Sequence, residues 1–461
     1  MRKILTFIAG TMITGSLLAG GLVTNTNQSA TFTRLQNRNA STGIDAVYYN
    51  PAGLTKLGDG FYLSLNNQII GQTKTVLSNY PYLTGVTATN QKEYVGKVSA
   101  PIFPGVYVAY KKGKLAFSAG FNPIGGGGGA KYDNGLPSFE MGIADLKPMV
   151  SGFGMTTTQY TADILFEGTS VYFGYQANIS YEINDMISAA VGARFVTAKN
   201  TYSGHINNIM INPVYAGNPS GALMSAPTFF TSIGEAGYAA ATSNREVDVE
   251  ETGTGFAPIL SLNIAPSEKL NIALRYEFQT KLELTTKVID NKSAGIFTDG
   301  SKAIADMPAS LSAGINYKPV NKLSVAGSLN YYFDKNVDYD GSESADINMI
   351  DKNFIEFGLG AEYGINDNLR ASAGWVTTMT GVNSDYQSDQ TYSTNTNSFG
   401  AGFGYRITPM IDLNLGGQYT LYADDSKTFN HMIGINPVPT TETYKKNTWV
   451  VGIGLDFYFG K

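Results

Sequence analysis

Near its C-terminus the chain alternates between large apolar residues and small or polar ones. Successive side chains of a β-strand point to opposite faces, so this segment has one apolar face and one small or polar face. The apolar parity holds Trp449, Val451, Ile453, Leu455, Phe457 and Phe459. Segments 171–182 and 355–363 repeat the pattern, and their charged residues fall on the second parity. A soluble β-sandwich also alternates, but glycine-rich polar faces on many strands favour a barrel with lipid outside and water inside.

A strand–turn–strand unit recurs along the chain, with Asn, Asp, Pro or Gly in its tight turn. The units start at Tyr110, Tyr181, Ala265, Tyr317, Tyr363 and Tyr405. Such turns join antiparallel strands, and long polar stretches lie between the units. The stretches expected to be loops are 122–168 and 206–250, followed by 289–306, 335–352, 379–396 and 424–446. Short turns at one end and long loops at the other are typical of outer-membrane barrels. We therefore expect an all-β fold, a transmembrane antiparallel β-barrel of about fourteen strands with its short turns in the periplasm.

The composition agrees with a barrel wall and excludes several kinds of site. Charged residues make up only 15% of the 461 residues, and the 52 glycines and 29 tyrosines suit small lumenal faces and aromatic girdles. The chain has no cysteine, which excludes disulfides and thiolate metal sites. Its net charge of −5 and its lack of a Lys/Arg block indicate no nucleic-acid partner. We therefore expect no cofactor, no metal and no nucleic acid.

The first residues have the pattern of an exported protein. Residues 1–3 are Met-Arg-Lys, residues 4–18 form an apolar run, and Ala19 is a small residue suited to a cleavage site. We therefore predict that residues 1–19 are a secretory signal peptide. A membrane-anchoring helix is the alternative, but polar residues interrupt the run and it is shorter than a bilayer needs.

The segment between the signal peptide and the first strand has no alternating pattern. A barrel of about fourteen strands has a lumen too wide for wall side chains alone to fill. We therefore expect residues 20–58 to lie in the lumen as a plug, inside a barrel formed by residues 59–461.

The chain resembles a known family at this plug. Residues 39–57, NASTGIDAVYYNPAGLTKL, contain Asn50, Pro51 and Ala52 and resemble the N-terminal hatch of the long-chain fatty acid transporter family, the FadL and TodX relatives. The strand count, the order of hatch and barrel, and the two long early loops also match. The resemblance implies passive uptake of hydrophobic compounds such as long-chain fatty acids across the outer membrane of a Gram-negative bacterium. It also implies contact with outer-membrane lipid and with the machinery that assembles barrels.

In that family the substrate enters a pocket above the hatch and leaves sideways at a kink in the third strand. Here the third strand is expected at about 114–122, and the glycine run Gly125–Gly129 follows it. Successive glycines weaken strand pairing and occupy no space, which suits an opening or a bend in the wall. A flexible loop linker is the alternative.

Two long loops are richer in apolar residues than segments in water should be. The residues expected to contact a hydrophobic ligand are Phe139, Met141, Phe153, Phe229 and Phe230. Apolar loop residues need a partner, which is either a ligand or other loop residues that form a lid. Parity also places Arg194 and Arg275 in the lumen, where a guanidinium group can bind a carboxylate. Lumenal charges in general should pair with one another or with the hatch, because unpaired buried charge is costly.

Other functions lack comparable support in the sequence. The only histidines are His205 and His431, and no nucleophile elbow or zinc motif occurs, so no catalytic residue is expected. A porin for small polar solutes is the main alternative, although it would need an open lumen and no N-terminal insert. A surface adhesin or structural outer-membrane protein would use the same loops without transport.

Overall fold

One antiparallel sheet closes on itself to form the wall of the protein. The computed structural model describes residues 29–84, 91–290, 297–337 and 349–460, and the predicted signal peptide lies outside the described residues. Fourteen strands form the ring, which confirms the predicted fold, and β18 pairs with β1 to close it. The ring consists of β1 (Gly60–Ser78), β2 (Lys92–Lys112), β3 (Leu115–Tyr132), β4 (Tyr160–Glu182), β5 (Ile187–Ile211), β7 (Arg245–Ser267), β8 (Leu270–Glu277), β11 (Ser310–Val320), β12 (Leu323–Tyr332), β13 (Phe354–Gly364), β14 (Leu369–Met379), β15 (Thr396–Thr408), β16 (Ile411–Tyr422) and β18 (Asn436–Gly460).

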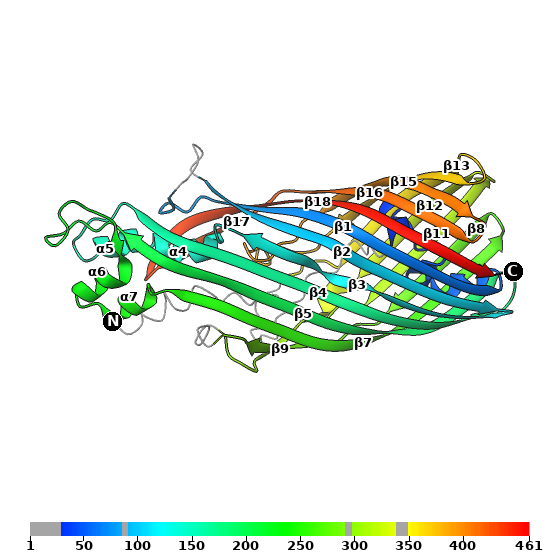
Figure 1. Ribbon diagram of the computed structural model, residues 1–461, viewed down its shortest axis with the longest axis horizontal. Coiled ribbons are helices and arrows are strands. Elements are labelled where there is room, and N and C mark those ends of the chain that lie inside the picture. The colour runs from blue at the N-terminus through cyan, green and yellow to red at the C-terminus, as the bar shows by residue number, and fades with distance from the viewer. Residues whose placement is uncertain (1–28, 85–90, 291–296, 338–348, 461) are drawn as a thin grey trace.

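The two ends of the barrel differ. At the turn end, ring strands are joined by the short turns that the repeated units predict. At the loop end lie β6 (Met224–Ser225), β9 (Glu283–Val288), β10 (Lys302–Ile304), β17 (Asp425–Ile433), α4 (Pro137–Ala144), α5 (Leu146–Ser151), α6 (Ala226–Ser232), α7 (Ala236–Ala241) and the 3-10 helix η3 (Asp334–Asn336). Figure 1 shows α4 to α7 gathered beyond this end of the long strands. None of the helices in the described part of the chain has the length and hydropathy needed to cross a bilayer.

The strands run further toward the loop end than the sequence pattern indicates. β3 continues to Tyr132 and β4 starts at Tyr160, so the predicted loop 122–168 is too long. The predicted loop 206–250 is too long for the same reason, and most of 424–446 belongs to the β17–β18 hairpin. Backbone hydrogen bonds hold these ladders beyond the lipid, where apolar and polar side chains no longer need to alternate.

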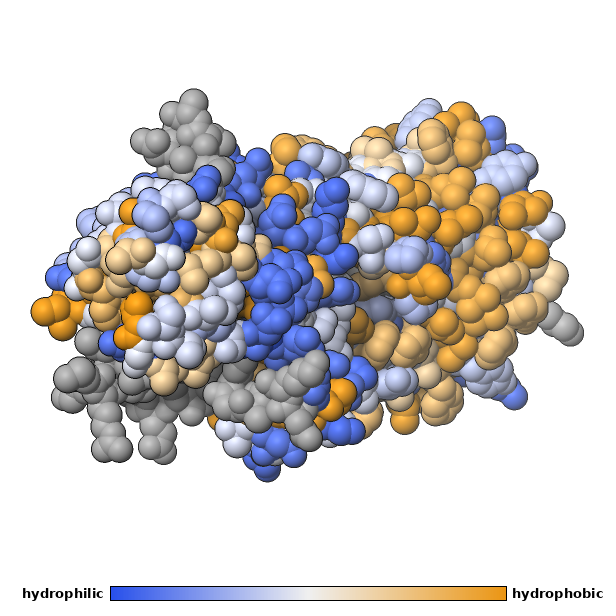
Figure 2. Space-filling view, turned by 60° about the vertical axis from the view of Figure 1, so that its left-hand side comes forward, coloured by the Kyte–Doolittle hydropathy of each residue, from blue (hydrophilic) through white to orange (hydrophobic). Residues whose placement is uncertain are grey.

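The outward side chains match the predicted parity. Val451 and Ile453 are 51% and 49% exposed, whereas Gly452 and Gly454 face residues inside the ring. Figure 2 shows hydrophobic residues gathered over the half of the barrel at the turn end, with a hydrophilic band beside them toward the loop end. An exposed apolar surface of this extent needs an apolar environment. These outward residues of the turn-end half, called the apolar belt, therefore fit a lipid bilayer.

Residues 29–57 lie inside the ring and are called the lumenal segment. They form α2 (Ala30–Arg34), α3 (Ala46–Tyr49) and the 3-10 helix η1 (Pro51–Lys56). α2 packs against β14, β15, β16 and β18, and η1 packs against β4, β5 and β7 in another part of the ring. Figure 1 shows this segment in blue behind the strands of the turn-end half. Residues 29–57 of the predicted plug, 20–58, thus lie within the ring, and the role of 20–58 as a plug or movable hatch stays a prediction.

Candidate functional site

The Asn-Pro-Ala element of the lumenal segment is buried and hydrogen-bonded to the wall. Asn50 Nδ2 donates to Asn263 Oδ1 on β7 at 2.7 Å. Pro51 O accepts a hydrogen bond from Ser180 Oγ on β4 at 2.7 Å, and Ala52 beside it is fully buried. The element therefore bridges two strands that are not neighbours in the ring, which fixes η1 against this side of the lumen.

Arg34 holds the other part of the lumenal segment. Its guanidinium donates to Glu362 on β13, to Ser372 Oγ on β14 at 2.7 Å and to Asn414 Oδ1 on β16 at 3.2 Å. Arg370 Nε lies 3.7 Å from the same carboxylate oxygen, Glu362 Oε2. These contacts agree with the expectation that lumenal charges pair with each other or with the plug, because unpaired charge in a low-dielectric interior is costly.

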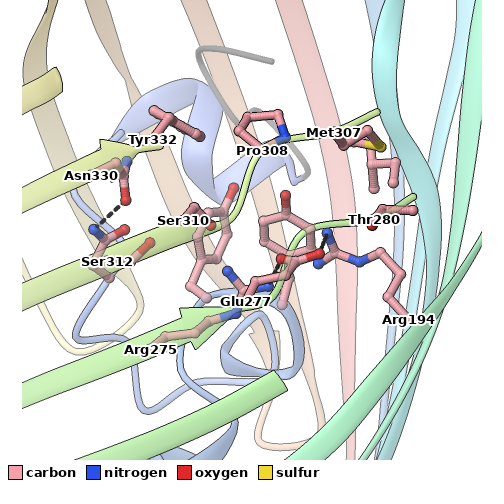
Figure 3. Close-up of a pocket in the computed structure, with 14 residues that line it drawn as sticks. Arg194, Arg275, Glu277, Thr280, Met307, Pro308, Ser310, Ser312, Asn330 and Tyr332 are labelled. Atoms are coloured by element: carbon pink, nitrogen blue, oxygen red, sulfur yellow. Dashed lines mark hydrogen bonds and ion pairs between the residues drawn. The ribbon is translucent and has the colours of Figure 1, made fainter. Parts of the chain in front are cut away.

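A small cavity lies between the lumenal segment and the wall (Figure 3). Its lining includes Tyr48, Ile124, Arg194, Arg275, Thr280 and Met307. Its free volume is about 30 Å³, whereas sites for drug-sized ligands measure about 300–1,000 Å³. The cavity is large enough for water but not for a long alkyl chain. The lumenal segment or the wall must therefore move before such a chain can pass.

Arg194 on β5 and Arg275 on β8 share the carboxylate of Glu277 in this cavity (Figure 3). Arg194 Nη1 lies 2.6 Å from Glu277 Oε1, and Arg275 Nη2 donates to the other carboxylate oxygen. Both guanidinium groups lie over the ring of Tyr48, at 4.7 and 5.4 Å from its centroid. Two cations and one carboxylate leave a net positive charge. Arg275 Nε is buried and has no hydrogen-bond partner among the described residues.

The wall is incomplete between β2 and β3. Their ladder has no paired residues between Val98 and Val106 of β2. On its other side β3 stays paired with β4 but shifts register twice within 123–128. The glycine run therefore lies in a bulged strand, and the alternative of a flexible loop linker is wrong. Gly126 has a φ of +82°, and a Cβ atom there would lie 2.2 Å from Ser170 O, so only glycine fits.

This gap lies between the cavity and the outer surface. Ile124 of β3 lines the cavity and is 3% exposed. Ile102, in the unpaired part of β2, is 75% exposed on the outside. An apolar side chain thus stands on each side of the place where the backbone hydrogen bonds are missing.

Four of the five predicted apolar ligand residues are buried together at the loop end. They are Phe139 and Met141 of α4 and Phe229 and Phe230 of α6, and none is more than 8% exposed. Phe153 is 38% exposed and packs edge-on against Tyr238 of α7, with the ring centroids 5.8 Å apart. The two long loops thus pack on each other as a lid, and Phe153 lies at its rim. The cluster is separate from the cavity that contains the two arginines.

The β14–β15 loop, residues 380–395, joins this lid to the wall. Asp389 Oδ2 accepts a 2.7 Å hydrogen bond from Ser138 N of α4. Tyr392 stacks on Tyr444 of β18, with the ring centroids 5.0 Å apart. Burial raises the pKa of the Asp389 carboxyl, because the charged form loses its contact with water.

Sequence reasoning identified the inward faces but not the contacts across the lumen. It assigned Arg194 and Arg275 to a ligand carboxylate, and the structure supplies one carboxylate from Glu277 on a wall strand. It gave no role to Ile124 or to loop 380–395. Parity fixes the side of the wall to which a residue points, but it gives no distance between distant strands. The proline and the five glycines around Ile124 were the one local signal of irregular pairing.

Comparisons with known proteins agree with this architecture. Residues 148–459 match the model of the family described as outer membrane protein transport protein (OMPP1/FadL/TodX). A FadL homologue from Pseudomonas aeruginosa has 13% sequence identity and a TM-score of 0.64, with 95% of this chain and 100% of that chain covered. The P. putida toluene transporter TodX has 14% identity and a TM-score of 0.56, with 96% and 100% covered. The Ralstonia pickettii toluene transporter TbuX has 15% identity and a TM-score of 0.52, with 96% and 99% covered. No curated protein sequence is significantly similar.

The family match covers well over half of the chain, and the structural matches show the same barrel. The protein is therefore an outer-membrane β-barrel of a family that transports hydrophobic compounds. The chain belongs to the OMPP1/FadL/TodX family of outer-membrane transport proteins.

Proposed function

We propose that the protein takes long-chain fatty acids across the outer membrane by passive transport, with no catalytic step. The observation that carries the proposal is a lumenal cavity beside the lumenal segment together with a gap in the β2–β3 ladder. A pore for hydrated solutes needs no gap in its wall. An apolar solute, in contrast, gains free energy when it leaves sideways into lipid.

The proposed route starts at the loop end and uses the predicted residues in turn. The apolar ligand residues are Phe139, Met141, Phe153, Phe229 and Phe230, which offer contact to an alkyl chain once the two loops separate. Arg194 and Arg275 then bind the carboxylate head group beside Glu277. The lumenal segment, with Asn50-Pro51-Ala52 at its bridge to the wall, acts as the hatch whose movement enlarges the cavity. The alkyl chain of the substrate then leaves the barrel sideways through the β2–β3 gap.

The charged centre favours an anionic substrate over a neutral one. Two of the similar solved structures are described as toluene transporters, and toluene has no charged group. In this chain two guanidinium groups and one carboxylate line the cavity, which leaves a net positive charge there. A carboxylate accepts forked hydrogen bonds from guanidinium groups, so a fatty acid suits this centre better than a hydrocarbon.

A porin for small polar solutes is the weaker candidate. The lumenal segment contacts strands in several parts of the ring, and the cavity beside it is about 30 Å³. A hydrated solute needs a continuous water path, which this arrangement does not favour. We further propose that residues 1–19 direct export, that the barrel-assembly machinery inserts the chain, and that outer-membrane lipid surrounds the apolar belt.

The test is uptake into lipid vesicles of a fluorescent long-chain fatty acid and, separately, of a sugar. Ile124→Trp places a larger side chain beside a cavity of only about 30 Å³, so it should slow fatty acid uptake several-fold. Ile102→Trp is the matched control, because it makes the same change on the outer side of the gap, where the side chain is 75% exposed.

Sugar flux should be low in the parent protein and in both variants. Equal rates of fatty acid uptake by the parent and by Ile124→Trp would contradict the proposed lateral route. Rapid sugar flux in the parent, unaffected by either substitution, would favour the porin instead.

A further inference from the structure

Two lysines face each other inside the lumen, above the lumenal segment. The β1–β18 register pairs Lys74 directly with Lys446, and Figure 1 shows these two strands side by side. Both residues share the inward parity of Val76 and Tyr444, which are fully buried. Both lysines are themselves half-buried, and their parity directs the side chains to the inside of the barrel.

Neither lysine is neutralised by a nearby carboxylate. Among the described residues, neither ammonium group forms an ion pair, whereas Lys445 of the outward parity pairs with Asp424 at 3.1 Å. Glu442 on the inward face of β18 hydrogen-bonds Tyr444, at 2.8 Å, and not Lys446. Like charges directly opposite each other in a ladder are destabilising, and half-buried cations without a carboxylate partner add to that cost. An anion bound between the two ammonium groups would remove the repulsion.

Two aromatic rings lie beside the Lys446 ammonium group. Lys446 Nζ lies 4.8 Å from the ring centroid of Tyr422 on β16 and 5.3 Å from that of Tyr392. Tyr392 comes from loop 380–395, and its hydroxyl donates to Lys445 O at 2.8 Å. It also belongs to a buried apolar cluster with Val76, Tyr94 and Tyr444. The site thus offers two cations for a head group and apolar surface for the chain attached to it.

The lysine pair lies well away from the arginine centre. Gln68 Nε2 of β1 donates to Ser29 O, in the first residue of the lumenal segment, at 3.0 Å. Along β1, Gln68 therefore marks how far the lumenal segment extends toward the loop end. Lys74 lies six residues further toward the loop end, which corresponds to about 20 Å of strand. Arg194 and Arg275 lie in the cavity against the lumenal segment. The lumen therefore has one cationic centre near the loops and another beside the segment.

We propose that Lys74 and Lys446 form an anion site in the upper lumen that binds the head group of an anionic amphiphile. The proposal rests on the proposed transport function and narrows its substrate to molecules with an anionic head and an apolar tail. A substrate bound here lies between the apolar lid and the arginine centre. The site serves as a first station from which the head group passes to Arg194 and Arg275.

The experiment compares two probes that differ only in charge. A fluorescent long-chain fatty acid and its methyl ester are titrated against the folded full-length protein in detergent micelles. In the double variant Lys74→Met/Lys446→Met, affinity for the fatty acid should fall by about tenfold or more, since hydrogen bonds to charged groups are worth about a decade in affinity each. Affinity for the ester should stay the same. Lys445→Met is the matched control, because it removes a neighbouring lysine of the opposite parity, and it should bind both probes as the parent does.

Two further measurements test the nature of the site. One asks whether the lysines act through their charge or through their shape, and the other asks whether the site prefers the head group of an amphiphile to a free anion. The variant Lys74→Arg/Lys446→Arg keeps both charges and should restore fatty acid binding. Inorganic phosphate should displace the fatty acid only at far higher concentration than a second fatty acid does, because it has no apolar tail. Displacement by phosphate at concentrations equal to those of the fatty acid would overturn the amphiphile site in favour of a free-anion site.

The remaining outcomes distinguish this inference from the proposed function. Parent-like fatty acid affinity in the double methionine variant would overturn the anion site and leave the transport function standing. An equal loss for the acid and the ester would also overturn it, because the lysines would then act through shape. Failure of the parent to bind either probe would instead contradict the transport function itself.

Discussion

Replacing Arg34 by methionine should release the lumenal segment without opening the wall. The Arg34 side chain is 3% exposed and donates to Glu362, Ser372 and Asn414 on three different strands. The wall ladders between these strands are made by backbone groups and do not involve Arg34. The substitution therefore removes the anchor of α2 and leaves the fourteen-strand ring closed.

The size of the effect follows from what Arg34 leaves behind. Removing one partner of a buried ion pair costs about 3–5 kcal/mol, mainly because the other charge stays buried without its partner. Glu362 is 25% exposed and keeps Arg370 at 3.7 Å, so the lower end of that range applies. About 3 kcal/mol corresponds to roughly a hundredfold increase in the population of states with a displaced segment.

Single-channel recording in planar bilayers measures this population directly. The parent protein should be closed for most of the record, and Arg34→Met should show frequent openings. Arg406→Met is the control, because Arg406 is 48% exposed and its contact with Asp412 is worth only about 0–1 kcal/mol. A correctly folded Arg34→Met protein with the same conductance as the parent would refute the hatch role of the lumenal segment.

Three further substitutions test the wall, the gap and the lid. Ile453→Arg places a cation on the lipid face, which should destabilise the barrel folded in vesicles by about 2–4 kcal/mol and lower its folding yield. Asn447→Arg, on the same face nearer the loop end, should cost only about 0–1 kcal/mol. Equal folding yields for the two variants would contradict the lipid-facing assignment. Gly126→Ala should lower the thermal stability of the folded barrel and slow fatty acid uptake, because its Cβ would lie 2.2 Å from Ser170 O, and Gly417→Ala, with nothing within 4 Å, should change neither. Burial raises the folded-state pKa of Asp389. Its contribution to lid stability is therefore fully present below the ordinary carboxyl pKa and is lost as pH rises through the folded value. Limited proteolysis at 380–395 should increase across that window in the parent but not in Asp389→Asn, and the same pH profile in both proteins would refute this origin.

The features that the sequence predicted correctly are those that depend on local periodicity. Alternation along a strand assigns each side chain to lipid or lumen, and both Ile453 and Gly454 lie where their parity places them. Tight-turn residues fix which strands are neighbours, so the closed ring of fourteen strands followed from counting hairpins. These signals repeat many times along the chain, and errors at one unit do not alter the others.

The features that the sequence did not predict depend on contacts between distant strands. The length of β3 was underestimated because its glycine run has no side chains to alternate, although β4 holds it by backbone pairing. Loop 380–395 has ordinary loop composition, and only the structure places Asp389 against α4 and Tyr392 against β18. Lys74 and Lys446 are 372 positions apart in sequence, so their pairing needs the register of the closing ladder.

The wall and the lumenal segment are held by contacts of different kinds, and this difference decides which of them can move. The ring is held by backbone ladders, and a buried backbone group without a partner is costly, so a stretch that is already unpaired, such as that between β2 and β3, would open at less cost than a paired ladder. The segment is joined to the wall largely by side-chain hydrogen bonds, such as those from Asn50 to Asn263 and from Ser180 to Pro51. Water can replace hydrogen bonds of this kind at a net cost of about 0.5–1.5 kcal/mol each. If the segment shifts while the barrel stays folded, contacts of this kind can be exchanged for water one at a time, and Arg34, with a charge buried against three strands, is the contact that most opposes the shift.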